Sequence, residues 1–164
     1  MKKLLVLFVA LLLAGSAYAL NETASYGPQN ITSCFAKDMN LVSGDVVVLQ
    51  TTSPTYPGRE VTGSSTVDQQ IYGIVVDGNV PASVATSEGG FVRVQTYGYC
   101  PIINVTTGGA YEVKAAIAVG DGLSTSGLSN RAGGQGATAV TFNVVALEAV
   151  SLAGSTTISG WISW

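Results

Sequence analysis

The chain has 164 residues, of which seven are Lys or Arg, ten are Asp or Glu and none is His. Without histidine it has no Ser-His-Asp triad, no Cys-His pair and no imidazole ligand for a metal ion. Seven basic residues in a chain of net charge -3 are too few for the phosphate contacts of a typical nucleic-acid binder, so no nucleic-acid partner is expected. The hydrophobic content of 47% excludes intrinsic disorder.

The first 19 residues have the pattern of a secretory signal peptide. Lys2 and Lys3 precede the apolar run Leu4 to Ala14, and the small-residue sequence Ala17-Tyr18-Ala19 follows. An N-terminal membrane anchor that stays attached is the alternative. Cleavage after Ala19 would leave 145 residues with five basic and ten acidic side chains, a net charge of -5. We therefore expect a secreted, extracellular or cell-surface protein with no membrane span after cleavage.

Two further features are typical of exported proteins. Cys34 and Cys100 are an even number of cysteines, and we expect them to form a disulfide, with two buried free thiols as the alternative. Asn21, Asn30 and Asn104 each begin an Asn-x-Thr sequon, which predicts surface glycosylation if the host glycosylates.

Residues 20–40 predict an N-terminal arm ahead of a β domain at 41–164. The arm is polar, contains Gly27-Pro28 and shows no steady period up to Ser33, which is typical of an exposed segment. Extended, Leu20 to Ser33 would reach about 45 Å, enough to cross onto a neighbouring subunit. Tyr26 and Ile31 are its candidate contact residues.

From Leu41 onwards, short β-type runs alternate with Gly, Asp, Asn, Ser and Pro. No window keeps helical spacing for three turns, and abundant Gly, Thr and Val disfavour helices. The fold class is therefore all-β, a compact single-domain barrel or sandwich of about seven to eight short strands with long Gly/Ser/Thr loops. The expected runs are Val46–Gln50, Ile71–Asp77, Phe91–Tyr97, Tyr111–Ile117, Thr138–Glu148 and Thr156–Trp164, and the longest loops are Thr51–Asp68 and Gly120–Ala137.

The two halves of the domain are faintly similar. Ser43-Gly44-Asp45 enters one apolar strand, and Val119-Gly120-Asp121 enters another later in the chain. Each entry is followed by a Gly-rich excursion and a returning apolar strand. Gene duplication and the ordinary construction of β-hairpins both explain this pattern.

The run Ala118 to Leu123, the loop Gly127 to Gly136 and the stretch Val145 to Ile162 resemble the small β-barrel modules of tailed-phage capsid decoration proteins. The Gly44-Asp45 strand and the Tyr72 to Asp77 strand fit the same order. The resemblance implies a barrel without a catalytic site that binds a repeating protein lattice and associates with copies of itself. The signal peptide, the cysteines and the polar arm depart from that family.

The sequence contains no convincing set of catalytic residues, and we expect neither an enzymatic activity nor a cofactor. Gly134 to Ala139 formally matches a dinucleotide fingerprint, but it follows a loop and opens a strand. Because a glycosidase needs only two carboxylates, Glu88, Glu112 and Glu148 are formal candidates, but we do not expect this activity. The aspartates stand singly at turns, as Asx-turn residues do, rather than in the pattern of a calcium loop.

The remaining function is assembly. A nearly uncharged β domain has little repulsion between copies, and an arm or an unpaired strand edge can add to a neighbour's sheet. We expect a non-enzymatic extracellular structural subunit of a filament or surface coat, with Tyr26, Ile31, Trp161 and Trp164 as contacts. A virion decoration protein is one alternative, with a repeating protein lattice as partner. A secreted carbohydrate-binding module is another, in which Tyr97, Tyr99, Trp161 and Trp164 would stack on a surface glycan.

Overall fold

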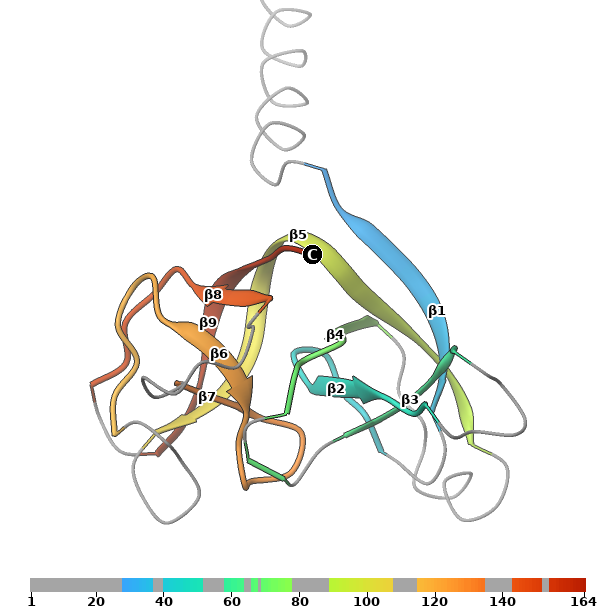
Figure 1. Cartoon of the computed structure of the whole chain (residues 1–164), viewed down its shortest axis with the longest axis horizontal. Coiled ribbons are helices and arrows are strands. Elements are labelled where there is room, and N and C mark those ends of the chain that lie inside the picture. Colours follow the sequence, from blue (N-terminus) through green and yellow to red (C-terminus); the bar gives the residue numbers. More distant parts are fainter. Residues whose placement is uncertain are drawn as a thin grey trace, which may run out of the picture.

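The computed structural model describes residues 28–36, 40–51, 58–63, 66–67, 69–77, 89–107, 115–134, 143–151 and 154–164. These residues form strands and no helix, so this part of the chain has no helix suited to crossing a membrane. The strands lie in two groups side by side, and one long strand arches over both (Figure 1). They are β1 (Asn30–Ala36), β2 (Val46–Leu49), β3 (Glu60–Gly63), β4 (Gly73–Asp77), β5 (Gly90–Thr107), β6 (Gly122–Thr125), β7 (Ala132–Gly134), β8 (Val144–Ala146) and β9 (Gly154–Ile162).

The first group is a closed ring of five strands, which we call ring A. β3 pairs with β1 in parallel and with β2 antiparallel, and β2 pairs in turn with β4. β4 pairs with the first part of β5, which pairs back with β1. β2 and β4 read VVVL and GIVVD, and such β-branched side chains pack well on a pleated surface. Every strand of ring A has a neighbour on both sides.

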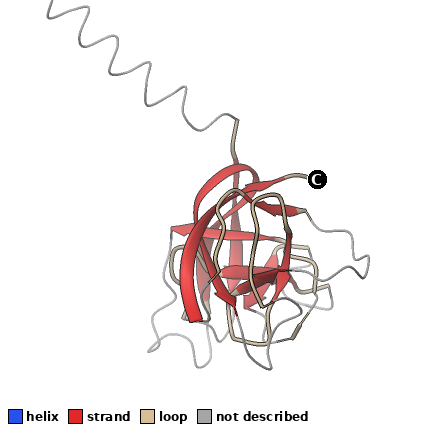
Figure 2. Cartoon of the chain, turned by 90° about the vertical axis from the view of Figure 1, so that its left-hand side faces the viewer, coloured by secondary structure: helices blue, strands red, loops and turns tan. Residues whose placement is uncertain are grey.

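The second group, ring B, closes in the same way around the second part of β5. β7 pairs with β5 in parallel and with β6 antiparallel, β6 pairs with β8, β8 with β9, and β9 with β5. β5 serves both rings because it is 18 residues long and bends at Gly98, whose φ is +95°. A Cβ at this glycine would collide with the carbonyl oxygen of Pro28, so only glycine fits there. Figure 2, turned so that ring B faces the viewer, shows the strands curving around a closed interior.

The two rings are a structural repeat. β2 pairs with β3 and β4 as β6 pairs with β7 and β8. The backbone bonds that fix the first strand of each ring are also the same. Gly44 N donates to Val75 O at 2.8 Å and Gly120 N to Ala146 O at 2.8 Å, while Val75 N donates to Asp45 O and Ala146 N to Asp121 O at 2.9 Å. The faint similarity in sequence therefore extends to the strand order and register of both halves, which favours duplication.

Each ring has its own apolar interior. Ring A encloses Cys34, Ala36, Leu41, Val47, Val61, Val75, Val92 and Val94. The interior of ring B includes Ile103, Val105, Ile117, Leu123, Ala132, Val144, Ala146 and Ile158, and this second cluster also takes in Val46, Ile71 and Ile74 from ring A. Because Val46 alternates with Val47, it points out of ring A, and the two rings share an apolar contact there.

The predicted all-β barrel is confirmed, with nine strands in the described residues instead of seven or eight. β3 lies inside the stretch predicted as the loop Thr51–Asp68, and β6 and β7 lie inside the predicted loop Gly120–Ala137. The run predicted at Tyr111–Ile117 falls mostly outside the described residues, and its last residue, Ile117, forms an isolated bridge to Val150. β6 and β7 read GLST and AGG, and every residue of both strands is buried. A strand buried on both faces does not alternate apolar and polar residues, so the sequence pattern did not reveal these two strands.

The prediction of an exposed arm up to Ser33 is wrong for its last residues. Asn30–Ala36 is β1, which pairs antiparallel with β5 from Gly90 to Tyr97 and closes ring A. Tyr26 and the expected signal peptide lie outside the described residues. Ile31, predicted as an arm contact, is half-buried in β1.

Candidate interaction surface

The same Gly-Asp turn begins the first inner strand of each ring. Gly44 and Gly120 have φ of +89° and +88°, a left-handed conformation that favours glycine. In each turn the aspartate carboxylate accepts a hydrogen bond from the N–H three residues earlier. These bonds join Val42 N to Asp45 Oδ2 at 2.9 Å and Ala118 N to Asp121 Oδ2 at 2.8 Å. The turns are therefore the same local structure, and their surroundings can be compared directly.

In ring A this turn is covered by ring B. The N–H of Asn104 donates to the Gly44 carbonyl at 2.8 Å, and its side-chain amide donates to Asp45 Oδ1 at 2.8 Å. A Cβ at Gly44 would lie 2.9 Å from Cγ2 of Ile102. Asn130 accepts the first N–H of β2 at 3.0 Å. Asp45 is consequently only 6% exposed, and its carboxylate is satisfied by amides instead of a cation.

In ring B the same turn lies open. A Cβ at Gly120 would meet no atom of the described residues within 4 Å. Val119, next to it, is 64% exposed, and Leu147 just after β8 is 40% exposed. The structure therefore presents the same turn once as a buried contact and once as an exposed apolar surface.

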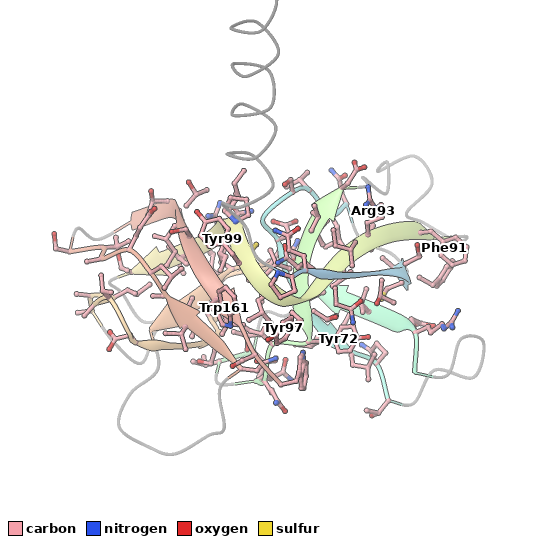
Figure 3. All side chains as sticks on the ribbon, turned by 90° about the horizontal axis from the view of Figure 1, so that it is seen from above. Tyr72, Phe91, Arg93, Tyr97, Tyr99 and Trp161 are labelled. Carbon is pink, nitrogen blue, oxygen red and sulfur yellow. The ribbon has the colours of Figure 1, made fainter. Side chains whose placement is uncertain are left out.

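Aromatic side chains gather where β5 passes from ring A to ring B, and Figure 3 shows Tyr72, Tyr97 and Trp161 in this central region. The Tyr97 and Trp161 rings meet edge to face, with centroids 6.1 Å apart. Tyr72 and Trp164 lie at the same separation with tilted planes. Trp164 is 65% exposed and Trp161 is half-buried. Tyr99, on the other side of the bend, is the register partner of Trp161 on β9.

Gln95 fixes the crossing of β5 and is a residue that the sequence analysis did not single out. Its side-chain amide donates to the carbonyls of Tyr97 and Tyr99 at 3.1 and 2.7 Å, on either side of the bend at Gly98. Gln29 adds a third bond, to the Tyr99 carbonyl at 3.0 Å. Gln95 is 1% exposed, so these bonds satisfy a buried amide. Its role depends on a bend that local sequence does not specify.

A groove of about 380 Å³ lies beside Tyr72 and Trp164. Its other lining residues are Val48, Leu49, Thr51, Gln69 and Gln70. None of the described residues that line it carries a charge, and they combine aromatic rings with amides and a hydroxyl. Such a surface suits an uncharged ligand that has both an apolar face and hydroxyl groups.

The predicted disulfide between Cys34 and Cys100 is wrong, because both cysteines are free and buried. Cys34 lies opposite Val92 on β5, and Cys100 is eight residues further along that strand, which spans up to about 26 Å when it is straight. A disulfide needs Cα atoms within about 7 Å. Burial raises the pKa of the Cys100 thiol to about 11. Burial also raises the pKa of Cys34, opposed in part by a hydrogen bond with Tyr72.

The three sequon asparagines have different surroundings. Asn30 is exposed at the start of β1, and Asn21 lies outside the described residues. The Asn104 side chain is part-buried between the rings, where its nitrogen donates to Asp45. That nitrogen is the atom to which a glycan would be joined, so a glycan would have to fit beside Asp45 between the rings.

The candidate catalytic residues do not come together in the described part of the chain. Glu88 and Glu112 lie outside it, as does most of the fingerprint Gly134 to Ala139. Glu148 accepts a hydrogen bond from Ser159 Oγ at 2.9 Å, which is a local strand-end contact. Within the described ranges no three Cys, Asp or Glu residues are grouped as metal ligands would be.

Comparison with known proteins adds no relative: the chain matches no family model and no curated protein.

Proposed function

We propose that the protein is a non-enzymatic structural protein that assembles with copies of itself outside the cell, as a subunit of a filament or surface coat. The observation that supports this proposal is the exposure of large apolar side chains on two closed, weakly charged rings. The most exposed are Phe91, Val119 and Trp164, at 64% to 65%. The expected signal peptide supports an extracellular site.

The closed rings change the expected mode of contact. Addition of a strand to a neighbour's sheet needs an edge with unpaired N–H and C=O groups. In the described residues every strand of both rings has two neighbours. Association therefore proceeds through side chains: burying apolar area stabilises a contact by about 25 cal/mol per Å². The low charge of the surface keeps repulsion between copies small.

The test is the concentration dependence of mass for the protein purified after expression of the full chain. Light scattering and negative-stain microscopy over a range from micromolar to millimolar should show particles that grow with concentration. Because the contacts are apolar, 1 M salt should not dissolve them. A monodisperse monomer at the highest concentration would contradict the proposal.

A capsid decoration protein is the second candidate. The closed five-stranded rings favour it, since the resemblance to decoration modules implies a small barrel of this kind. If the protein is a decoration protein, it should bind to virus particles and associate little with copies of itself. Co-sedimentation with particles from the host, by a protein that stays monomeric alone, would replace the first proposal with this one.

Carbohydrate binding is favoured by a separate observation, the uncharged groove beside Tyr72 and Trp164. Retention on a glycan array that is lost in Trp164→Ala would support it. Phe91→Ala is the matched control, because Phe91 is equally exposed at 65% and does not line the groove.

A further inference from the structure

We infer that copies of this chain associate head to tail, by repeating between molecules the contact that ring B makes with ring A inside each chain. This inference rests on the proposed self-assembly and specifies which surfaces meet. It follows from one asymmetry: the Gly-Asp turn is buried in ring A and exposed in ring B.

The contact between the rings joins two different surfaces. In a contact with twofold symmetry, the same patch is buried on both partners. Here Gly44 is buried by ring B, whereas Gly120, its counterpart, remains exposed. The contact is therefore heterologous, and a heterologous contact that is repeated builds a closed circle or an open filament. Ring B retains the surface to which a further ring would bind.

The open surface of ring B is more apolar than the covered surface of ring A. In ring A, the surface beside ring B includes the exposed Ser43, the half-buried Val76 and the buried Gln95, which line a small crevice with Pro101 and Ile102. The strand registers place Val119, Leu147 and Trp161 at the corresponding positions of ring B. At these three positions ring B has three apolar side chains and ring A has only one. An exposed apolar surface of this kind is typical of a protein contact site.

Ring A carries the counterpart of the covering surface. By register, Ile102 and Asn104 of β5 correspond to Ser33 and Phe35 of β1. Ser33 is exposed and Phe35 is half-buried. Figure 1 shows β1 along the outer side of ring A, away from ring B.

Charge agrees with this placement. Inside the chain, the Asn130 amide approaches Asp45 Oδ2 at 3.5 Å. The register of β3 and β7 places Arg59 at the position of Asn130. A head-to-tail contact would therefore bring Arg59 of one copy towards Asp121 of the next. Opposite charges meeting across an interface favour one register and one partner.

The test is cross-linking between two single variants, Val119→Cys and Ser33→Cys, with a short bismaleimide. Both sites are exposed, whereas Cys34 and Cys100 are 0% and 2% exposed and should not react in the folded protein. A heterologous contact predicts covalent dimers in the mixture of the two variants and at least about tenfold fewer in either variant alone. Equal melting temperatures of the variants and the parent protein would show that the fold is retained.

A second variant measures the energy of the same contact. Val119→Asp should raise the concentration needed for assembly by at least about tenfold, as loss of a central interface residue does. Val42→Asp is the matched control, because Val42 is 46% exposed beside the corresponding turn of ring A, which ring B of the same chain already covers. This variant should leave the concentration needed for assembly unchanged.

The outcomes separate this inference from the proposed function. Particles that form without cross-links in the mixture, or with equal cross-links in each variant alone, would overturn the head-to-tail contact and leave self-assembly standing. A monomer at all concentrations would overturn both. An equal effect of Val42→Asp and Val119→Asp would also overturn the specific contact.

Discussion

Ring A and ring B reach the same strand order with different interiors. In ring B, Ile103 reaches across to Gly160: a Cβ on that glycine would lie 2.5 Å from Cδ1 of the isoleucine. The corresponding positions of ring A hold Cys34 and Val94, a smaller and a larger residue. Cores tolerate such exchanges when the total volume is kept. The comparison teaches that turn geometry and strand register define this fold, while each interior is filled in its own way.

The rings differ more in what lies outside them. Ring A is buried on one side by ring B, through Asn104 and Asn130, and the turn that these residues cover is open in ring B. Two similar units are thus unequal neighbours within one chain.

The largest expected effect breaks the contact between the rings. Asn104→Asp keeps the shape of the side chain but replaces the N–H donor, 2.8 Å from Asp45 Oδ1, by a second carboxylate. The new carboxylate would face the buried carboxylate of Asp45, and this loss of a partner combined with like charge should cost about 4 kcal/mol of the free energy of unfolding, measured by urea denaturation. Asn30→Asp, at an exposed position, is the control and should change stability by less than about 0.5 kcal/mol. Equal effects would show that Asn104 does not hold the rings together.

The next effect tests the exchange of volume between the cores. Gly160→Ala should cost about 3 kcal/mol, because the new Cβ meets Cδ1 of Ile103 and lies 2.9 Å from the Val145 carbonyl oxygen. Ile103→Val removes that Cδ1 and should cost about 1 kcal/mol alone. The double variant should therefore be more stable than the sum of the two predicts, by about 1 kcal/mol or more in a double-mutant cycle. Strict additivity would show that the two side chains do not share this space.

A smaller effect compares the two turns directly. Gly44→Ala and Gly120→Ala both place a side chain at a φ near +90°, which costs about 1 kcal/mol in each case. Only at Gly44 does the added Cβ also meet Ile102, at 2.9 Å, and Asn104, at 3.1 Å. Because of this overpacking, Gly44→Ala should be less stable than Gly120→Ala by about 1.5 kcal/mol in thermal or urea denaturation. The opposite order would mean that the turn of ring A is not the covered one.

Local sequence could predict the class of the fold and its strongest strands. Runs of Val and Ile predict β2 and β4, and the pair of Gly and Asp predicts each of the two turns. β7 could not be predicted, because the sequence AGG owes its strand conformation to pairing with β6 and β5. Propensity reports what a segment prefers alone, and long-range pairing overrides it.

The candidate site was predicted only in part. The sequence drew attention to Trp161 and Trp164 as aromatic residues in a terminal β run, but their neighbours Tyr97 and Tyr72 come from β5 and the approach to β4. The prediction of a disulfide was wrong because it rested on an even number of cysteines in an exported chain. Whether two cysteines can form a disulfide depends on the distance between them in the fold. The burial of Asp45 by Asn104 joins residues 59 positions apart, which no local pattern reports.

The smallest effect uses the free thiol of ring B as a measure of its burial. Burial raises the pKa of Cys100 to about 11 in the folded chain, from an ordinary value of 9.0. Between these values the unfolded chain loses the thiol proton while the folded chain keeps it. Stability should therefore be fully present below about pH 9 and fall as the pH rises towards 11, by about 1 kcal/mol at pH 10 from this group.

Urea denaturation at pH 8 and pH 10 measures this loss, and Cys100→Ala removes the contribution of that thiol. The difference in stability between the two pH values should be smaller in Cys100→Ala than in the parent protein. Cys34→Ala reports the same property for ring A, whose thiol also has a raised pKa but shares a hydrogen bond with Tyr72 that opposes the shift. Its effect should be the smaller of the two, because that bond stabilises the thiolate form. An unchanged alkaline loss in Cys100→Ala would place that thiol in contact with solvent and would contradict the closed interior of ring B.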